Sequence, residues 1–381
     1  MIRVTKEIVS CDDFELGIKR ETPLKYTITY PKDVVAKAIV FIIPGFGEDT
    51  DSGYIEHISD YVSREFSVAV VNVFYHCFYS RENNGAALEF DDFDIAGLKK
   101  VIHKYNIDFS GVKEITKESI IQKLMEVNSA INISMTLVPK NGEYQNFGVM
   151  QALAHLYVLK DIKKIEALKN VNKTICIGSS HGGYIANMIA KINPSAIDYV
   201  IDKDNNVNFP EYILNSDKVK INCFVQTYWM TDKISKYYFS PDRENIRNIN
   251  HYEHIKTMAK SGNCKTKYIF YHSVKDKLAP VGDKIALTQT LRLNGFECDV
   301  KILENKEDID GKFIKNLEHG MGMSIKELIN IELPSILKKL ETQEEILNNP
   351  YPVQYKCRDV TYIFDLSDPK CINNEKNCEI F

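Results

Sequence analysis

The stretch TICIGSSHGGYIANMIA, Thr174–Ala190, places two serines and a histidine among glycines where a predicted strand becomes a predicted helix. Gly178, Ser180 and Gly182 match the spacing G-x-S-x-G of a nucleophile elbow. In such an elbow the serine adopts an unfavourable backbone conformation, and the glycines let strand and helix approach closely. The spacing alone arises by chance in roughly one chain in ten of this length. The β-rich run before it and the helical pattern after it favour Ser180 as a nucleophile, whereas Ser179 is out of register.

An elbow serine needs a carboxylate and a histidine, which follow it in that order along the chain. Of the nine histidines, only His319 lies beyond the last predicted strands, in the glycine-flanked loop NLEHGMGMSIKE. Two acids remain open. Asp276 comes a few residues after the apolar run KYIFYHS and just before a proline-led helix, and Asp202 ends the preceding run AIDYVID. A carboxylate at either place could orient the imidazole, and Asp276 is the preferred candidate.

Backbone N–H groups that would stabilise a developing oxyanion are expected at His181, directly after the serine, and at Phe46 in the loop PGFGED. His76, in the segment YHCFYSR after another predicted strand, is a candidate for the wall of a binding pocket. Aromatic residues further on, including Trp229 and Tyr238, could contact a substrate. They could equally form a small core of their own segment.

Composition narrows the class of protein. The 381 residues are 44% hydrophobic and 26% charged, with a net charge of −4, which argues against a nucleic-acid surface. The nine cysteines are odd in number and form no C-x-x-C pair, so neither a metal site nor a disulfide framework is expected. The chain has no Rossmann or P-loop glycine pattern, and no cofactor is predicted. With no apolar leader and no membrane-spanning run, we expect a cytoplasmic protein with a small-molecule partner and no membrane or nucleic-acid partner.

Apolar runs alternating with helical patterns predict an α/β fold with a mostly parallel central sheet and helices on both faces. The predicted buried strands are AIVFII, SVAVVNVFY, KTICIG, AIDYVID, KYIFYHS and ECDVKIL, and FELGIKRE and PLKYTITYP before them are predicted antiparallel strands. Helices are predicted over 147–159, 184–191 and 281–293. A capping box formed by Ser324 and Glu327 predicts the start of another helix.

We expect one domain over residues 1–381, interrupted twice. The segments at about 81–144 and 204–264 are too long to be structureless loops in a compact domain. Helical insertions are therefore expected, with a helix around 115–127 in the first and the second acting as a lid over Ser180. A C-terminal extension covers about 343–381, in which VQYKCRDVTYIFDLS is typical of a β-hairpin.

Four segments, PGFGED, GSSHGG, VKDKLAP and EHGMG, together resemble the functional segments of the α/β-hydrolase superfamily in the same order. The resemblance covers roughly residues 36–337 and implies that Ser180 attacks an acyl carbonyl, His319 transfers protons and Asp276 orients His319. The chain also resembles an uncharacterised family of bacterial hydrolase-like proteins associated with flagellin-modification gene clusters. Two features depart from the α/β-hydrolase pattern: the histidine at 181, beside the candidate nucleophile, and the long stretch ENKEDIDGKFIKNLE before His319.

The expected function is hydrolysis of an ester through an acyl-enzyme, with an acylated sugar as one candidate substrate. An acyltransferase would use the same three residues, because the first step of the reaction is identical. A non-catalytic binding protein of the same fold is the third hypothesis. An intact set of serine, acid and histidine argues against it.

Overall fold

The computed structural model describes residues 1–46, 53–90, 94, 98, 102–114, 116–126, 135–208, 224–342, 352–366 and 378–380. Its contacts divide the chain into two compact units. The first contains Met1–Tyr75, Phe147–Phe209 and Ser240–Phe381, and the second contains His76–Asn146 and Pro210–Phe239.

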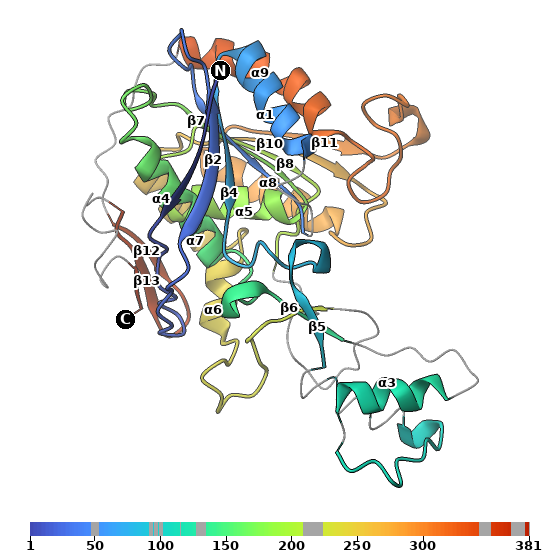
Figure 1. Ribbon diagram of the computed structural model, residues 1–381. Coiled ribbons are helices and arrows are strands. Elements are labelled where there is room, and N and C mark those ends of the chain that lie inside the picture. Colours follow the sequence, from blue (N-terminus) through green and yellow to red (C-terminus); the bar gives the residue numbers. More distant parts are fainter. Residues whose placement is uncertain are drawn as a thin grey trace. The chain divides into compact units, whose positions relative to one another are not determined.

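The first unit is built on an eight-stranded sheet (Figure 1). Its order is β1 (Ile2–Ile8), β2 (Leu24–Tyr30), β4 (Ala69–Phe74), β3 (Ile39–Ile43), β7 (Thr174–Ser179), β8 (Tyr199–Lys203), β10 (Lys267–Ser273) and β11 (Cys298–Leu303). β2 pairs antiparallel with β1 and β4, and the remaining pairs are parallel. The α/β prediction with a mostly parallel sheet is therefore confirmed.

Helices cover both faces of this sheet, which explains why its central strands are apolar throughout. On one face, Ile58 of α1 (Gly53–Phe66) and Leu333 of α9 (Ile325–Glu341) share a core with Val40 of β3. On the other face, α4 (Val149–Ile162), α5 (His181–Ile192) and α8 (Val281–Leu293) pack, and the ring of Phe41 in β3 meets His155 of α4. None of the helices that the described residues form is long and apolar enough to cross a lipid bilayer.

Two local predictions are wrong. FELGIKRE is a turn between β1 and β2, because the Asp13 carboxylate accepts hydrogen bonds from the N–H groups of Glu15 and Leu16 and Gly17 adopts φ 63°. α9 does begin after Ser324, but that side chain makes no capping hydrogen bond. Its hydroxyl instead lies 3.4 Å from the Tyr54 hydroxyl.

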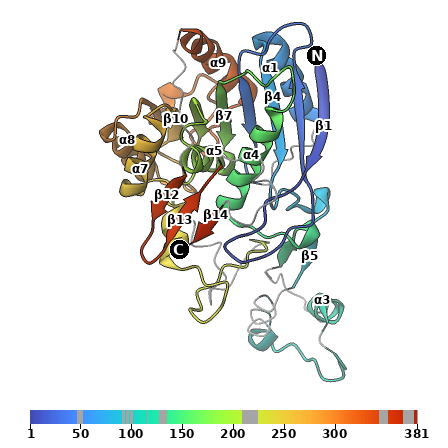
Figure 2. The same ribbon diagram turned by 90° about the vertical axis from the view of Figure 1, so that its left-hand side faces the viewer.

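The predicted C-terminal hairpin is confirmed as β12 (Val353–Lys356) and β13 (Thr361–Phe364), with β14 (Cys378–Ile380) added to its edge (Figure 2). α6 (Pro241–Arg247) and α7 (Tyr252–Gly262), predicted as part of an insertion, belong to the first unit. The buried Arg247 guanidinium binds both carboxylate oxygens of Glu15, which also accepts a hydrogen bond from Tyr362 of β13. This ion pair joins the N-terminal turn, α6 and the hairpin.

The second unit contains two short helical turns, η1 (Glu82–Asn84) and η2 (Lys140–Gly142), and a helix, α3 (Lys117–Met125). The helix predicted around 115–127 is therefore confirmed. A small sheet pairs β6 (Thr136–Val138) antiparallel with β5 (Ala87–Glu89) and parallel with β9 (Phe224–Val225). Residues 209–223 of the predicted lid lie outside the described part of the chain, and the lid role stays a prediction.

Candidate active site

Ser180 occupies the turn between β7 and α5 with a strained backbone. Its φ is 50° and its ψ is −119°, a combination that serine rarely adopts. The two glycines of the motif permit this turn. A Cβ on Gly178 would lie 2.2 Å from the carbonyl oxygen of Gly182, and a Cβ on Gly182 would lie 2.1 Å from that of Ile43. Side chains at these positions would push α5 away from β7 and from the end of β3.

His319 lies in a loop that other strands hold in place. The Ser273 hydroxyl, at the end of β10, donates a 2.5 Å hydrogen bond to the carbonyl of Leu317. The Lys203 ammonium, at the end of β8, donates a 3.0 Å hydrogen bond to the carbonyl of Met323. The long stretch before His319 therefore ends in a loop anchored on both sides of the histidine.

Three side chains form a continuous row of hydrogen bonds. His319 Nε2 lies 2.8 Å from Ser180 Oγ, and His319 Nδ1 lies 2.7 Å from Asp276 Oδ2. The other oxygen of Asp276 accepts hydrogen bonds from the N–H groups of Leu278 and Ala279, at 2.8 and 3.0 Å. A carboxylate only accepts, so Nδ1 carries the proton and Nε2 is free to accept the serine proton.

The electrostatics of the row follow from these contacts. Burial opposes ionisation of Asp276, but hydrogen bonds from His319 and from two backbone N–H groups hold its pKa below the ordinary value. The hydrogen bond to Asp276 raises the pKa of His319 against the opposing effect of burial, and the negative charge of Asp276 adds to the rise. An ionised acid beside a basic imidazole is the arrangement in which imidazolium is stabilised.

The rival acid Asp202 has different partners. It is fully buried and its Oδ2 lies 2.6 Å from the Lys284 ammonium and 3.1 Å from the Asn187 amide. Its other oxygen accepts the N–H of Asn205. The structure thus brings Asp276, and not Asp202, to His319.

Asp204 and His272 lie behind the row, and the sequence analysis did not identify them. Asp204 Oδ2 accepts the N–H of Gly320 at 2.6 Å, and its Oδ1 lies 3.7 Å from His272 Nδ1. Together with Asp276 they form a group of ligand-type atoms within 4.8 Å of one another. Asp276, Asp204 Oδ2 and His272 Nε2 already take part in hydrogen bonds. Only Asp204 Oδ1 and His272 Nδ1 of this group remain, and two ligand atoms are too few for a metal ion held by the protein. In the sequence, the polar run DKDNN at the end of β8 was the feature that could have indicated Asp204.

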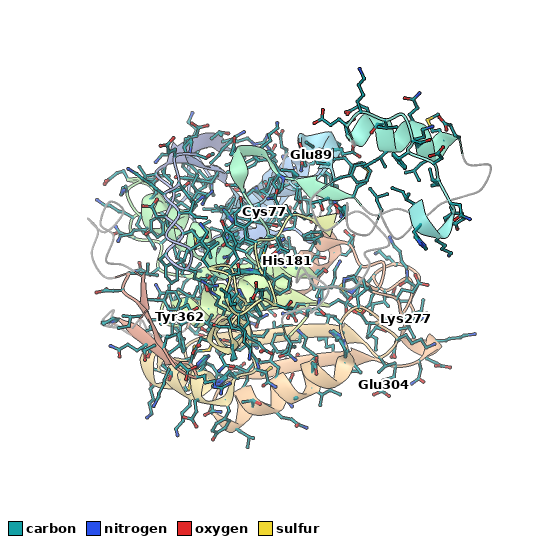
Figure 3. The ribbon with its side chains drawn as sticks, turned by 90° about the horizontal axis from the view of Figure 1, so that it is seen from below. Cys77, Glu89, His181, Lys277, Glu304 and Tyr362 are labelled. Atoms are coloured by element: carbon teal, nitrogen blue, oxygen red, sulfur yellow. The ribbon has the colours of Figure 1, made fainter. Side chains whose placement is uncertain are left out.

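The two residues predicted to supply oxyanion N–H groups lie next to each other. The rings of Phe46 and His181 meet edge to face with centroids 5.9 Å apart. His181 begins α5, where the first N–H groups of a helix have no partner within the helix. The Nε2 atom of the His181 ring lies 3.1 Å from Gln151 Oε1. Burial lowers the pKa of His181 to about 3, so the ring is neutral. Figure 3 shows His181 among interior side chains, whereas Lys277, from the loop that carries Asp276, projects outward.

The family described as "Protein of unknown function (DUF2920)" matches residues 4–373. The chain belongs to the DUF2920 family. A search of curated proteins found no match.

Solved structures similar to this DUF2920 chain are α/β-hydrolases. Acylaminoacyl peptidase from Pyrococcus horikoshii is 11% identical with a TM-score of 0.50, covering 91% of this chain and 43% of the peptidase. This chain thus spans less than half of that protein. Esterase 2 from Thermogutta terrifontis is 10% identical with a TM-score of 0.47, covering 90% and 96% of the two chains. The likeness to the peptidase shows the α/β-hydrolase fold, as predicted, and at 11% identity it shows the fold alone.

The three residues of the DUF2920 chain predicted to contact substrate lie in the second unit. His76 is buried against the ring of Tyr144, with Nδ1 3.7 Å from a carboxylate oxygen of Glu143. Trp229 is 0% exposed, and its indole N–H donates to the carbonyl of Asn146. Tyr238 is partly exposed. Substrate contact by these residues stays a prediction, and the burial of Trp229 favours the alternative that it forms a core.

Replacement of Trp229 by alanine should destabilise the second unit by about 3–5 kcal/mol, because it leaves a large cavity and removes the hydrogen bond to the carbonyl of Asn146. The measurement is thermal unfolding, with Tyr238→Ala as the control for loss of a partly exposed ring. If Trp229→Ala keeps the wild-type melting temperature and changes the order of preferred esters, the indole contacts substrate and the core role is wrong.

Proposed function

We propose that this protein is a serine hydrolase that cleaves a carboxylic ester through an acyl-enzyme intermediate. One observation carries the proposal: Ser180, strained at an elbow, is joined to His319 and Asp276 by hydrogen bonds of 2.8 and 2.7 Å. Nucleophile, base and orienting acid within hydrogen-bond reach are the arrangement that activates a hydroxyl for acyl transfer. The α/β-hydrolase fold is compatible with this chemistry but does not by itself establish it.

In the proposed reaction, His319 Nε2 takes the hydroxyl proton as Ser180 Oγ attacks the carbonyl carbon of the ester. The resulting imidazolium is stabilised by Asp276, and the negative oxygen of the tetrahedral intermediate accepts hydrogen bonds from the backbone N–H groups of His181 and Phe46. His319 then gives its proton to the leaving alcohol, and the acyl-serine forms. Water, deprotonated by His319, then attacks the acyl carbon. The bond from that carbon to Ser180 Oγ breaks, His319 returns the proton to Oγ, and the acid is released.

The nature of the acyl group is suggested by apolar side chains near the row. Phe46 is 39% exposed beside His181, and Leu278, whose N–H binds Asp276, is 63% exposed. Exposed rings and aliphatic groups at this place favour an ester with an apolar acyl portion. An acylated sugar, as suggested by the resemblance to proteins linked to flagellin modification, is the narrower form of the proposal.

The proposal is tested by labelling the purified protein with a fluorophosphonate, followed by peptide mapping. A single adduct on the peptide that contains Ser180, together with hydrolysis of p-nitrophenyl acetate, would support it. No adduct and no hydrolysis would refute it and leave the non-catalytic hypothesis. A fluorophosphonate adduct on the Ser180 peptide, together with rapid transfer of the acetyl group of p-nitrophenyl acetate to added alcohols but not to water, would support the acyltransferase instead.

The rate should depend on pH through His319, which must be neutral to accept a proton. Its pKa is raised, so the protonated, inactive form persists to a higher pH than for an ordinary histidine, whose pKa is about 6.5. We therefore expect kcat/KM to rise with pH and to reach half its maximum above about pH 6.5. The measurement is hydrolysis of p-nitrophenyl acetate across the neutral range, and a midpoint below that of free histidine would contradict the role of Asp276 in raising the pKa.

A further inference from the structure

Asp204 is a buried residue next to the hydrogen-bonded row of Ser180, His319 and Asp276. It follows the last residue of β8, is 0% exposed and has φ 55°, a conformation that costs energy for a residue other than glycine. Its N–H donates to the carbonyl of Tyr271 in β10, at 3.1 Å. Its carboxyl group is therefore held at the end of two adjacent strands of the sheet.

From this place Asp204 reaches the loop that carries the histidine. Its Oδ2 accepts the N–H of Gly320 at 2.6 Å, and Gly320 is the residue directly after His319. The 2.6 Å contact fixes the peptide group from which the imidazole projects. Gly320 has φ 80° and Met321 has φ 53°, so the backbone here does not follow a regular element. The Asp204 contact adds to the backbone hydrogen bonds that Met321 donates to Glu318 and that Met323 donates to Gly320.

The second oxygen of Asp204 indicates its protonation state. Oδ1 lies 3.7 Å from His272 Nδ1, and neither atom has a hydrogen-bond partner among the described residues. His272 Nε2 donates to the carbonyl of Ala279 at 2.8 Å, so Nδ1 of the neutral ring carries a lone pair. The 3.7 Å separation is longer than a hydrogen bond, and a proton on one of the two atoms removes the repulsion between two buried lone pairs that face each other.

The charged and titratable groups around Asp204 place that proton on its carboxyl. They are Asp276, His319, His272 and Lys203. Burial, and next the negative charge of Asp276, raise the pKa of Asp204 to about 7, with His319, Gly320 and Lys203 opposing the rise. Burial lowers the pKa of His272, which stays neutral. Of the two carboxyl groups, Asp276 is the ionised one.

We propose that Asp204 is a positioning residue for His319 and that, up to about neutral pH, Asp204 acts as a neutral carboxylic acid. It holds the histidine loop through the Gly320 N–H, and its other oxygen faces His272 Nδ1 at 3.7 Å. Its neutral state leaves Asp276 as the negative charge paired with the imidazole. Ionised Asp204 would add a second negative charge near His319 and stabilise the protonated ring, which cannot act as a base.

Two substitutions separate the hydrogen bond from the charge. Asp204→Asn keeps an oxygen for the Gly320 N–H and offers an N–H to His272, so it imitates the neutral acid, whereas Asp204→Leu has similar size and no acceptor. We expect Asp204→Leu to lower kcat about tenfold to a hundredfold with little change in KM, since a small displacement of a catalytic group has this effect. Asp204→Asn should keep kcat within about threefold of wild type. Equal loss of kcat in the two variants would overturn the proposal.

A spectroscopic readout does not depend on turnover. The proton between His319 Nδ1 and Asp276 Oδ2 should give a downfield proton resonance, present in wild type and Asp204→Asn and lost or shifted in Asp204→Leu. This inference rests on the proposed function only for its kinetic readout. Absence of ester hydrolysis by wild type would refute the function, whereas an unchanged resonance in Asp204→Leu would refute the role of Asp204.

Stability against pH tests the neutral acid even if Asp204→Leu fails to fold. A carboxyl whose pKa is raised on folding stabilises the fold below its unfolded pKa, near 4, and that stabilisation is lost as the pH rises through about 7. Asparagine has no such loss, so the melting temperature of Asp204→Asn should gain on wild type between these pH values. A constant difference would show that Asp204 is ionised throughout, against the proposal.

Asp198 supplies a matched control. It is another buried aspartate of the first unit, whose Oδ2 accepts the N–H of Thr174 at 2.7 Å, at the end of the sheet where β7 begins. Asp198→Leu removes a comparable hydrogen bond to a backbone N–H, together with an ion pair to Lys265 at 3.3 Å, at the other end of β8 from Asp204. It should lower the melting temperature and leave kcat and the downfield resonance as in wild type. If it lowers kcat as much as Asp204→Leu does, the effect is a general loss of stability and the proposal fails.

Discussion

Ser180→Ala should lower kcat for p-nitrophenyl acetate by about four to six orders of magnitude and abolish fluorophosphonate labelling. The Ser180 hydroxyl is the group that His319 Nε2 contacts at 2.8 Å. Without the hydroxyl no acyl-enzyme can form, and only binding and oxyanion stabilisation remain. Alanine has the same Cβ as serine and meets the same backbone strain at φ 50°, so the stability of the fold should be unaffected. The measurements are steady-state kinetics, labelling and thermal unfolding.

Ser179→Ala is the control for this experiment. Ser179 is the adjacent residue, buried as the last residue of β7, and its loss should leave an appreciable fraction of the activity and of the labelling. If the two variants lose activity equally, Ser180 is not the nucleophile and the predicted register of the elbow is wrong.

His319→Gln and Asp276→Asn should have the next largest effects. The first removes the base, and we expect a loss in kcat comparable to that of Ser180→Ala, because residues of one catalytic unit act together. The second keeps the shape of the acid but removes its charge and favours the wrong tautomer of the imidazole, with an expected loss of about 10⁴-fold. Asp276 Oδ2 lies 2.7 Å from His319 Nδ1. Steady-state kinetics of both variants provide the test.

Asp202→Asn tests the acid assignment from the other side. Asp202 forms a buried ion pair with Lys284 at 2.6 Å, and removal of one charge should cost about 3–5 kcal/mol of stability because the ammonium stays buried. We expect a lower melting temperature and a kcat close to wild type at temperatures where the variant is folded. A loss of kcat like that of Asp276→Asn, with unchanged stability, would make Asp202 the orienting acid.

Much of the fold was predictable because it depends on local patterns. The runs AIVFII, KTICIG and KYIFYHS are apolar at every position and form β3, β7 and β10, which are covered on both faces. The segment 281–293 has the bounds of α8. FELGIKRE failed because its alternation of apolar and polar residues is shared by a turn, which Asp13 stabilises through its side chain. A pattern of eight residues does not distinguish the two.

The candidate nucleophile and the candidate histidine were predicted from the sequence for different reasons. Gly178, Ser180 and Gly182 are close in the chain, and their spacing together with the apolar run before them and the helical pattern after them predicts an elbow. His319 was the histidine that remained after the others were eliminated. The acid could not be decided in this way. Asp202 and Asp276 both lie at the ends of buried strands. The choice between them depends on Lys284, which lies in a helix, 82 residues further along the chain, and binds the carboxylate of Asp202.

What the sequence by itself determined is therefore whatever lies within a few residues: strands, helices, the elbow and the order of the chemical groups. Only the tertiary structure decided which groups meet. Asp204 contacts Gly320 across 116 residues of sequence, and the His319 to Ser180 contact spans 139. No local pattern encodes such a pairing, because it arises when parallel strands bring the loops at their carboxyl ends to one edge of the sheet. Burial there also changed the chemistry of Asp204, whose raised pKa depends on neighbours that only the folded chain assembles.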